Sequence, residues 1–390
     1  MAKQNKPAIR FKGFTDAWEQ RKAKELCNIG TGKSNTQDQV EDGIYPFYIR
    51  SDIPVKSNKY LYDCEAVITI GDGNIGRVFH YVNGKFDLHQ RCYKMTDFQD
   101  IWGKYFYYFF STRFYDRAMK MTAKATVDSV RLEMISEMDI WKPTAIDEQK
   151  KIAEFFANLD HLITLHQRKY DKLQVLKKAM LEKMFPKNGS SVPEIRFKGF
   201  TDAWEQRKLG EVVKEVTRND PTSEAPIMMI TANNGFIEQS ERYAFDNAGE
   251  SLKKYILLQK GELAYNHGAS KLRPFGSCFA LTTAESARIP FVYHCFSAEN
   301  QNAEFLSIEL NGSEVESQLR KIVSSGARMD GLLNISFDEY STVTVLLPDI
   351  KEQEHIADFF RNLDHLITLH QRELEKLQNI KKSMLEKMFV

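Results

Sequence analysis

The chain has 390 residues, 42% of them hydrophobic and 12% aromatic, and its 54 Lys and Arg nearly balance 53 Asp and Glu. This length and apolar content predict two or three domains with ordinary cores. The net charge of +1 requires any nucleic-acid-binding surface to be local. The five cysteines have no C-x-x-C spacing. This argues against a zinc site or a disulfide framework and predicts reduced, buried thiols.

The stretch Met1–Arg10 is polar and basic and lacks the apolar run of a signal peptide. The most apolar aromatic cluster, Tyr105–Phe110, is far too short to span a membrane. We therefore expect a cytoplasmic protein without a membrane partner.

The first element is an arm, Ile9–Lys22, which returns unchanged as Ile195–Lys208. Each arm is followed by a variable segment, at about 23–145 and 209–349. The two segments share little sequence, but their order of elements is similar, and each reads as a globular α+β domain. The first segment has strand-like runs at 46–50, 66–70, 77–82 and 139–143 and a helix at 103–121. The second has them at 227–231, 254–258, 262–266, 277–281, 291–297 and 342–347, with a helix at 303–323.

A long helix-forming stretch follows each variable segment. Glu148–Phe185 and Glu352–Phe389 are identical at 28 of 38 positions. Apolar residues, Leu162 and Leu366 among them, recur at steps of three and four, which predicts two amphipathic helices of about 57 Å. One such helix cannot bury its apolar stripe alone, so we expect the two to pack together. The turn-forming linker at 186–193 makes the pair antiparallel and brings Phe389 near the N-terminal arm.

Two glycine-rich stretches resemble nucleotide-binding motifs. Gly71–Gly76 fits G-x-G-x-x-G, but β-forming residues follow it and reach Asn83-Gly84, a hairpin signal, where a dinucleotide site requires a helix. Gly30–Ser34 resembles the end of a P-loop, but Cys27 occupies the position of the first glycine. A nucleotide-using enzyme therefore stays a minor hypothesis.

Other catalytic patterns are missing from the sequence, including G-x-S-x-G, H-E-x-x-H and the Asn/Asp-Pro-Pro-aromatic motif of amino-methyltransferases. The helix histidines His161, His166, His365 and His370 lack metal-ligand spacing, so we expect them on solvated or packed helix faces. We expect no catalytic residue, no metal and no cofactor in this chain.

Recognition of DNA is the remaining possibility. Loops of both variable segments carry residue types that hold phosphates and read base edges, although ordinary solvated loops have a similar composition. The candidate DNA contacts are Lys33, Arg50, Arg77, His89, Gln90, Arg91, Lys124 and Arg131 in the first segment and Arg218, Asn233, Asn234, Asn266, His267, Lys271, Arg273 and Arg328 in the second.

Several motifs favour one family. They are Arg-Phe-x-Gly-Phe-x-x-x-Trp-Glu at 10–19 and 196–205, the strand-to-helix junctions at 143–148 and 348–352, Asn-Leu-Asp at 158–160 and 362–364, and the segments 45–50, 71–73, 89–91 and 263–266. Together they make the chain resemble, over essentially its whole length, the specificity subunits of Type I restriction–modification systems.

The expected fold is α+β, with two target-recognition domains joined by a pair of long antiparallel helices in a pseudo-two-fold arrangement. The expected divisions are the arm and target-recognition domain 1 at 1–145 and the first long helix at 146–186. The linker, repeated arm and target-recognition domain 2 follow at 187–349, and the second long helix at 350–390.

The resemblance implies that each domain reads one half of a bipartite, asymmetric site on double-stranded DNA. The helix pair would set the spacer and dock two modification subunits, which methylate adenine with S-adenosylmethionine. Two restriction subunits would use ATP and Mg for translocation and cleavage, so this chain would be a non-catalytic part of a bacterial defence system. The expected docking residues are Asp160, His161, Thr164, Gln167, Arg168, Asp364, His365, Thr368, Gln371 and Arg372.

A second hypothesis is a tandem-repeat scaffold whose variable domains bind proteins and not DNA. Salt dependence separates the two, because binding through several phosphate contacts weakens steeply as salt rises.

Overall fold

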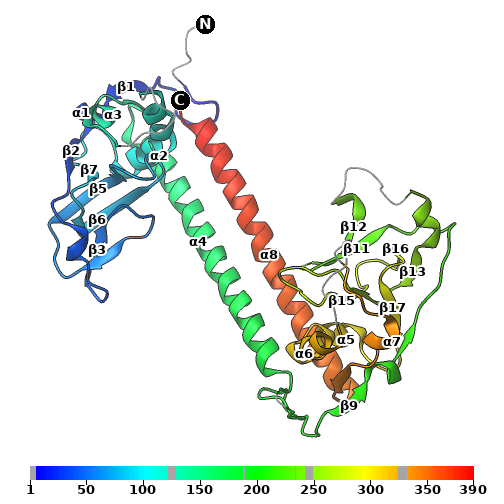
Figure 1. Ribbon diagram of the computed structural model, residues 1–390. Coiled ribbons are helices and arrows are strands. Elements are labelled where there is room, and N and C mark those ends of the chain that lie inside the picture. The colour runs from blue at the N-terminus through cyan, green and yellow to red at the C-terminus, as the bar shows by residue number, and fades with distance from the viewer. Residues whose placement is uncertain (1–5, 122–128, 188, 233, 242–248, 324–331) are drawn as a thin grey trace. The chain divides into compact units, whose positions relative to one another are not determined.

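The computed structural model describes residues 6–121, 129–187, 189–232, 234–241, 249–323 and 332–390. The chain divides into two compact units: unit 1 contains Met1–Arg168 and His370–Val390, and unit 2 contains Lys169–Leu369. Both boundaries fall inside the long helices, drawn in green and in orange to red in Figure 1. Each helix therefore contributes a segment to each unit.

The first variable domain, in unit 1, is built on a mixed sheet. Its strands follow the order β2-β7-β5-β6-β3-β4, and β3 pairs with β6 in parallel while the other neighbours are antiparallel. The predicted α+β character of this domain is confirmed. Its elements are β1 (Glu19–Lys22), α1 (Ala23–Leu26), β2 (Asn28–Thr31), η1 (Thr36–Asp38), β3 (Tyr45–Tyr48), β4 (Val55–Ser57), β5 (Tyr62–Ile70), β6 (Phe79–Leu88), β7 (Cys92–Thr96), α2 (Gly103–Lys120), α3 (Leu132–Ser136) and β8 (Asp139–Lys142).

Helix α2 supplies most of the aromatic core of this domain. Phe106, Phe110 and Phe114 are fully buried, and Phe79 of β6 meets Phe110 edge to face with ring centroids 5.6 Å apart. Burying each such ring contributes about 1.5–3 kcal/mol. The predicted helix at 103–121 is confirmed, and it packs on the sheet.

One expected turn is wrong. Asn83-Gly84 lies in the middle of β6, where Gly84 is opposite Cys64 of β5. The β5–β6 turn is residues 71–78, with Gly73 at φ +85° and Gly76 at φ +68°, a conformation that favours glycine. The motif Gly71–Gly76 therefore connects two antiparallel strands and opens no helix, as expected.

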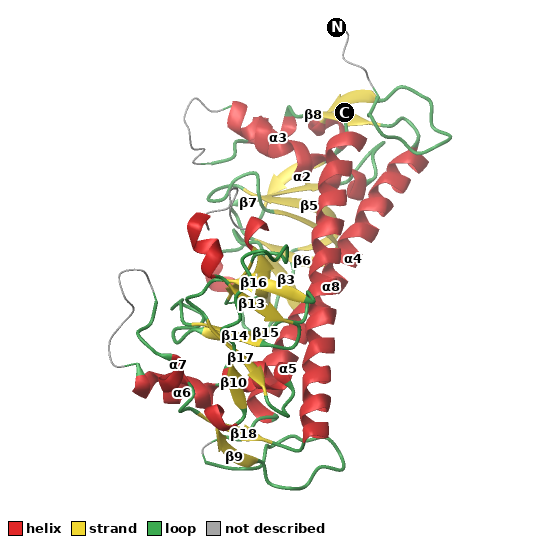
Figure 2. Cartoon of the chain, turned by 90° about the vertical axis from the view of Figure 1, so that its right-hand side faces the viewer, coloured by secondary structure: helices red, strands yellow, loops and turns green. Residues whose placement is uncertain are grey.

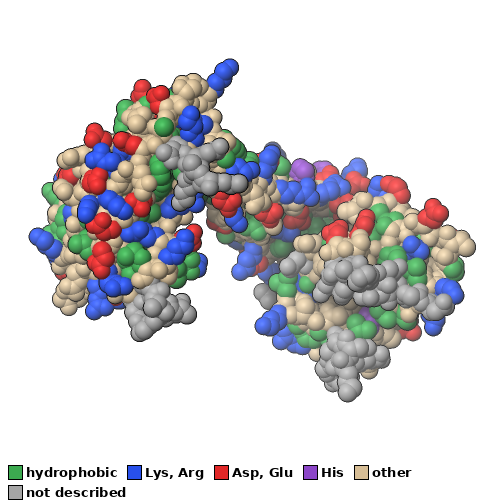
Figure 3. All heavy atoms as spheres, turned by 90° about the horizontal axis from the view of Figure 1, so that it is seen from above, with side chains coloured by type: hydrophobic (Ala, Val, Ile, Leu, Met, Phe, Trp, Pro, Cys, Tyr) green, Lys and Arg blue, Asp and Glu red, His purple; other side chains and the backbone are tan. Residues whose placement is uncertain are grey.

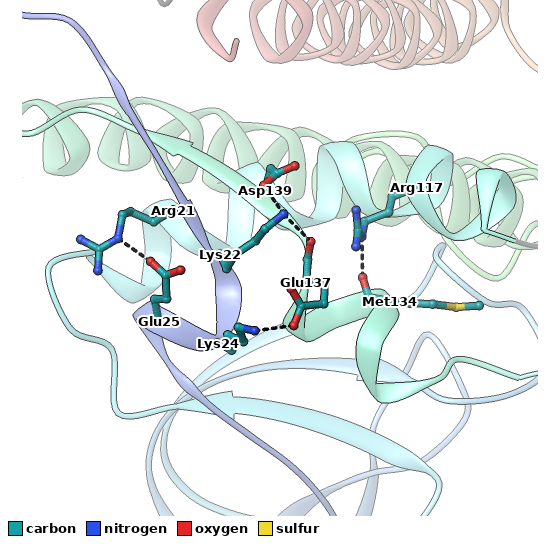
Figure 4. Close-up of polar contacts among 8 residues, drawn as sticks. All are labelled: Arg21, Lys22, Lys24, Glu25, Arg117, Met134, Glu137 and Asp139. Carbon is teal, nitrogen blue, oxygen red and sulfur yellow. Dashed lines mark hydrogen bonds and ion pairs between the residues drawn. The ribbon is translucent and has the colours of Figure 1, made fainter.

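The arm contains a strand, β1, that periodicity does not reveal, because its residues are all polar. It pairs antiparallel with β8, the strand before the long helix, with Lys22 opposite Asp139. Ion pairs line this joint (Figure 4): Lys22 Nζ lies 2.5 Å from Asp139 Oδ1, and Lys24 Nζ lies 2.6 Å from Glu137 Oε1. The arm is thus anchored beside the start of the helix.

The second variable domain, in unit 2, has an antiparallel sheet in the order β10-β17-β14-β15 and the antiparallel pairs β11-β12, β13-β16 and β9-β18. The pairing of β9 with β18 repeats that of β1 with β8. The elements are β9 (Glu205–Lys208), η2 (Leu209–Glu211), β10 (Val213–Glu215), β11 (Met228–Thr231), β12 (Gly235–Glu238), η3 (Gln239–Glu241), η4 (Gly249–Lys254), β13 (Ile256–Gln259), β14 (Leu263–Asn266), β15 (Ser277–Ala280), β16 (Ser286–Ile289), β17 (His294–Ala298), α5 (Ala303–Leu310), α6 (Ser313–Ile322), α7 (Phe337–Tyr340) and β18 (Thr344–Leu347).

The single helix expected at 303–323 is two helices, α5 and α6, separated at Asn311. The Asn311 side-chain amide donates to the carbonyl oxygens of Ser307 and Cys278, and its Oδ1 accepts the Cys278 N–H. Asn side chains compete with the helical backbone through such bonds. Gly312 follows, so α5 ends here.

The two predicted long helices are confirmed as α4 (Ile146–Lys183) and α8 (Ile350–Met388), and both are continuous in Figure 2. In unit 1 they run antiparallel, because Phe156 of α4 stacks on Phe389 and Asp160 pairs with Lys381. The Asp160–Lys381 distance is 2.5 Å.

Unit 2 repeats these contacts with the roles of the helices exchanged. Phe360 of α8 lies 6.1 Å from Phe185 between ring centroids, and Asp364 Oδ1 lies 2.5 Å from Lys177 Nζ. The helix segments within unit 2 are therefore antiparallel as well.

Each arm closes the end of a long helix. In unit 1 the Ile9 N–H donates to Lys387 O at 3.0 Å, and in unit 2 the Ile195 N–H donates to Lys183 O at 2.9 Å. The expected approach of Phe389 to the N-terminal arm is confirmed by its place in the unit 1 core.

A repeated glutamine fixes each strand-to-helix junction. Gln149 Nε2 donates to the carbonyl oxygen of the preceding proline at 2.9 Å, while its Oε1 accepts the Trp102 N–H at 2.8 Å. Gln353 makes the same two bonds in unit 2, the second with the Asn302 N–H at 3.0 Å. Each glutamine thereby orients its helix against the variable domain.

Candidate nucleic-acid interface

Two of the predicted DNA contacts in unit 1 meet on one carboxylate. Asp72, in the turn after β5, lies 2.8 Å from Arg91 Nη1 and 3.2 Å from Arg50 Nη1 through its Oδ2. The two arginine side chains remain 63% and 45% exposed. A guanidinium has five N–H donors, so both arginines keep donors for a ligand. We call Arg50, Asp72 and Arg91 the Asp72 cluster.

This cluster has the chemistry of a phosphate or base contact. A guanidinium binds phosphate or the guanine edge through paired N–H donors, and Asp72 limits the orientations of both arginines. Gly71 is required beside it, because an added Cβ would lie 2.6 Å from Arg91 O. Figure 3 shows basic and acidic side chains interspersed over the face that it draws.

His89 was expected to contact DNA, but it is buried, with 4% of its surface exposed. Its Nδ1 accepts the Arg91 backbone N–H at 3.1 Å, and its Nε2 lies 3.4 Å from Thr36 Oγ1. Burial, followed by the charge of Arg50, lowers the pKa of His89. The neutral imidazole therefore positions the Arg91 backbone and does not face a ligand.

Two polar side chains of this region, Asp87 and Asn35, were not identified from the sequence as partners of the candidate residues. Buried Asp87 accepts the Ser34 hydroxyl at 2.7 Å, and Asn35 Oδ1 accepts from Gln90 Nε2 at 2.6 Å. The first bond joins the loop at 33–36 to the end of β6, and the second joins it to the loop at 89–91. A carboxylate inside the otherwise apolar end of β6 was the available signal for Asp87, because such a group needs partners.

The other unit 1 candidates are exposed: Lys33, Arg77, Gln90 and Arg131. Arg77 lies over the Tyr115 ring, 4.4 Å from its centroid, and donates to the Tyr115 hydroxyl at 2.9 Å. Ser129 bridges to Asp72, which brings the segment of Arg131 beside the Asp72 cluster. Lys124 lies outside the described residues.

Two arginines of unit 2 that were predicted to contact DNA make hydrogen bonds within the domain. Arg218 donates to Leu257 O and pairs with Glu262 at 2.6 Å. Arg273 Nη1 donates to Asn311 O at 2.8 Å, and burial lowers the pKa of Arg273. These arginines fix loops of the domain.

Asn266 and His267 likewise build the scaffold, contrary to expectation. The Asn266 side-chain amide donates to Ile230 O at 3.1 Å. His267 is 8% exposed, and its ring nitrogens lie 2.7 Å from the carbonyl oxygens of Leu333 and Val292. Asn266 ends β14 and is half-buried, whereas His267 directly after it is buried, with both ring nitrogens held by backbone carbonyl oxygens.

Asn234 and Lys271 are exposed. Asn234 lies in the β11–β12 turn and Lys271 in the loop after β14. The Asn266–Ile230 bond joins the starts of these two loops. Asn233 and Arg328 lie outside the described residues.

The predicted docking carboxylates serve the helix pair. Asp160 binds Lys381 and accepts the Tyr108 hydroxyl at 2.8 Å, and Asp364 binds Lys177. The other predicted docking residues are exposed: His161, Thr164, Gln167, Arg168, His365, Thr368, Gln371 and Arg372.

Apolar side chains on the same helices were assigned to the wrong face. Leu162 and Leu366, expected in the buried stripe, are 40% and 42% exposed. Leu165 and Leu369, one turn further, are 38% and 44% exposed. These four are repeat-related pairs, so each helix presents the same apolar residues at its surface.

Among the described residues, no group of three or more His, Cys, Asp and Glu side chains is arranged to hold a metal ion. A search of the same residues finds no helix with the length and hydropathy of a membrane span. All five cysteines are described and free, four of them buried. The expected burial is confirmed for these four, whereas Cys64 is half-buried. Burial raises the pKa of Cys27 and Cys92 to about 12.

Comparison with known proteins gives consistent matches. Residues 15–175 match the family model of the Type I restriction modification DNA specificity domain. The chain is 24% identical over 382 residues to the Type I restriction enzyme MjaVIII specificity subunit of Methanocaldococcus jannaschii, covering 89% of this chain and 86% of that protein. Over 76 residues, 20% of this chain and 17% of the relative, it is 30% identical to the EcoDI specificity subunit of Escherichia coli.

A solved structure has the same fold. The crystal structure of the Type I restriction–modification system S subunit from M. genitalium aligns with 99% of this chain and 99% of its own, with a TM-score of 0.61 at 14% sequence identity.

Proposed function

Because residues 15–175 match the Type I restriction modification DNA specificity domain and most of the chain is similar to a specificity subunit, we propose that this chain is a specificity subunit of a Type I restriction–modification system. We further propose that each variable domain reads one half of a bipartite, asymmetric site on double-stranded DNA. The repeated frame supports the proposal. Identical arms and near-identical helices carry two domains of different sequence, and direct readout depends on the side chains presented. Two variable domains of different sequence, carried by repeated arms and helices, suit a DNA target whose two halves differ in sequence.

The observation that carries this proposal in unit 1 is the Asp72 cluster. Two exposed arginines converge on one carboxylate. Gln90, which precedes Arg91, and Arg77, in the same turn as Asp72, are exposed as well. We assign base or phosphate contacts to these side chains. In unit 2, exposed Asn234 and Lys271 take this role.

The helix pair is proposed to set the distance between half-sites. Both helices are continuous over about 38 residues, and the segments within each unit are antiparallel. Pairing along their whole length would give a stiff spacer of about 57 Å. Reading modules on one face of B-DNA lie about one turn, ~34 Å, apart, which this spacer can accommodate.

The repeated exposed leucines are proposed to dock two modification subunits, with His161, Gln167 and Arg168 and their counterparts around them. Two identical surfaces suit two identical partners. The modification subunits would hold S-adenosylmethionine, and two restriction subunits would hold ATP and Mg. The chain itself would be non-catalytic and would supply the DNA sequence specificity.

Mapping methylated adenines tests the proposal directly. The full chain is expressed with a modification subunit in cells that lack other adenine methylation. We expect one bipartite motif, and replacing a single variable domain with that of a relative should change one half of it. Methylation at unrelated single sites, or a change of both halves after one exchange, would contradict the proposal.

A further inference from the structure

Two histidines that are copies of each other meet in unit 1. His166 of α4 and His370 of α8 are 204 residues apart, which is the repeat distance of the helices, and their Nδ1 atoms lie 3.1 Å apart. The ring centroids are 5.1 Å apart, with 67° between the ring planes. Both residues are half-buried.

The helix pairing explains this meeting. Ile163 lies one turn before His166 and is half-buried, while Leu374 lies one turn after His370 and is 6% exposed. The two histidines therefore occupy packed positions of the helix contact. Side chains on paired helices are held more rigidly than side chains on loops.

Their geometry suits a shared metal ion. Imidazole nitrogens bind Zn²⁺ at about 2.0–2.1 Å, so two nitrogens on a tetrahedral ion lie roughly 3.3 Å apart. The observed Nδ1–Nδ1 distance of 3.1 Å is close to this value before any metal binds. Imidazole is a good ligand for zinc, copper and nickel.

We propose that His166 and His370 form a two-histidine site for a divalent transition-metal ion, with water completing the coordination. Neither helix alone carries a metal motif, because the second ligand comes from the other repeat. Binding would connect α4 to α8 within unit 1 and stabilise the folded state by mass action. The site is independent of the DNA-reading function.

Calorimetric titration of the chelator-treated full chain with Zn²⁺ tests this site. We expect one Zn²⁺ per chain, with affinity falling at least about tenfold in His166→Gln and in His370→Gln. His355→Gln removes an exposed histidine of α8 and should bind as the wild type does. Zn²⁺ should also raise the thermal unfolding midpoint of the wild type and of this control, and leave both site variants unchanged.

A spectroscopic measurement on the wild type avoids any folding defect of the variants. One equivalent of Cu²⁺ should give an electron paramagnetic resonance spectrum with coupling to two imidazole nitrogens. Circular dichroism in chelator verifies the fold of each variant. If the two imidazole rings only form a hydrogen bond with each other, neither Zn²⁺ nor Cu²⁺ should bind stoichiometrically. That result, or binding that survives either substitution in a folded variant, would overturn the proposal.

Discussion

Arg10 and Glu148 are 138 residues apart in sequence and form a bidentate ion pair, with Nε 2.6 Å from Oε1 and Nη2 2.7 Å from Oε2. Their side chains are 13% and 1% exposed. Arg196 and Glu352 form the same pair in unit 2, with both distances 2.7 Å. Each pair ties an arm to the first turn of a long helix, where a carboxylate is also favoured by the helix dipole.

Arg10→Ala should destabilise unit 1 strongly, because it leaves the buried Glu148 carboxylate without its cation. The expected cost is about 3–5 kcal/mol, measured by urea unfolding. The exposed arm residue Lys12 provides the control, since Lys12→Ala should change stability by less than about 0.5 kcal/mol. Equal stability of Arg10→Ala and wild type would show that the arm does not hold the helix.

Phe389→Ala should also destabilise unit 1. The ring is 3% exposed, and its centroid lies 5.5 Å from Tyr105, 5.7 Å from Phe109 and 5.6 Å from Phe156. Truncating a buried Phe typically costs about 3–5 kcal/mol. Urea unfolding measures the loss, and Val175→Ala, at a 69% exposed position of α4, should leave the midpoint nearly unchanged.

Glu309 should make the stability of unit 2 depend on pH. Burial raises its pKa to about 7, although the Leu346 N–H donates to its Oε1 at 3.0 Å. The unfolded carboxyl ionises near its ordinary pKa of 4.5, so the unfolded state releases its proton first as pH rises. The stabilising contribution of Glu309 is therefore fully present below pH 4.5 and is lost as pH rises to about 7, by at most about 3 kcal/mol.

Glu309→Gln should remove most of this dependence, because the amide oxygen can still accept the Leu346 N–H. Unfolding free energies at pH 5 and pH 8 should differ less in this variant than in the wild type. Glu224→Gln, at an exposed position of unit 2, should retain the wild-type difference. An unchanged difference in Glu309→Gln would show that other groups cause it.

Arg91→Ala should weaken DNA binding by about 1–3 kcal/mol if the guanidinium reads a base, and it should relax specificity at one position of the motif. If Arg91 instead binds a phosphate, the log–log salt slope should become shallower by about one. Fluorescence anisotropy at several salt concentrations, with a DNA duplex that contains the motif found by methylation mapping, distinguishes these outcomes. Lys24→Ala removes the same charge at the arm joint and should preserve affinity.

Leu162→Glu should remove one modification subunit from the complex, and Leu162→Glu with Leu366→Glu should remove both. Each substitution places a charge on an exposed apolar position that both helices share. Native mass spectrometry counts the subunits. Val175→Glu is the control, because its repeat counterpart is Asn379 and the position is not part of a repeated surface.

The long helices could be predicted from periodicity, because helix pairing buries a regular apolar stripe. The strands of the arms could not, because Glu19–Lys22 is wholly polar and becomes a strand only through β8. The Arg10–Glu148 pair likewise involves residues too distant in sequence for a local pattern to reveal.

The candidate site was predictable only in part. Arg50 and Arg91 were selected by residue type and are exposed, whereas His89 and His267 were selected on the same grounds and are buried. Asn266 is half-buried and donates to a backbone carbonyl oxygen. Residue type does not show whether a polar side chain at the end of a strand points to solvent or hydrogen-bonds to a backbone N–H or carbonyl group. Residue type also does not show that Asp72 forms ion pairs with both Arg50 and Arg91, because the geometry of the turn determines which side chains meet.

The ties between arm and helix have a consequence for the gene. Arg10, Glu148, Arg196 and Glu352 lie at or beside stretches whose sequence is duplicated, outside the variable interiors. Homologous recombination within the duplicated stretches could exchange the DNA that encodes one variable segment. The new segment would then still be flanked by the residues of the arm–helix ion pair. A lineage could thus acquire a new variable domain by one such exchange, with a crossover in the duplicated stretch on each side, and keep every contact between arm and helix.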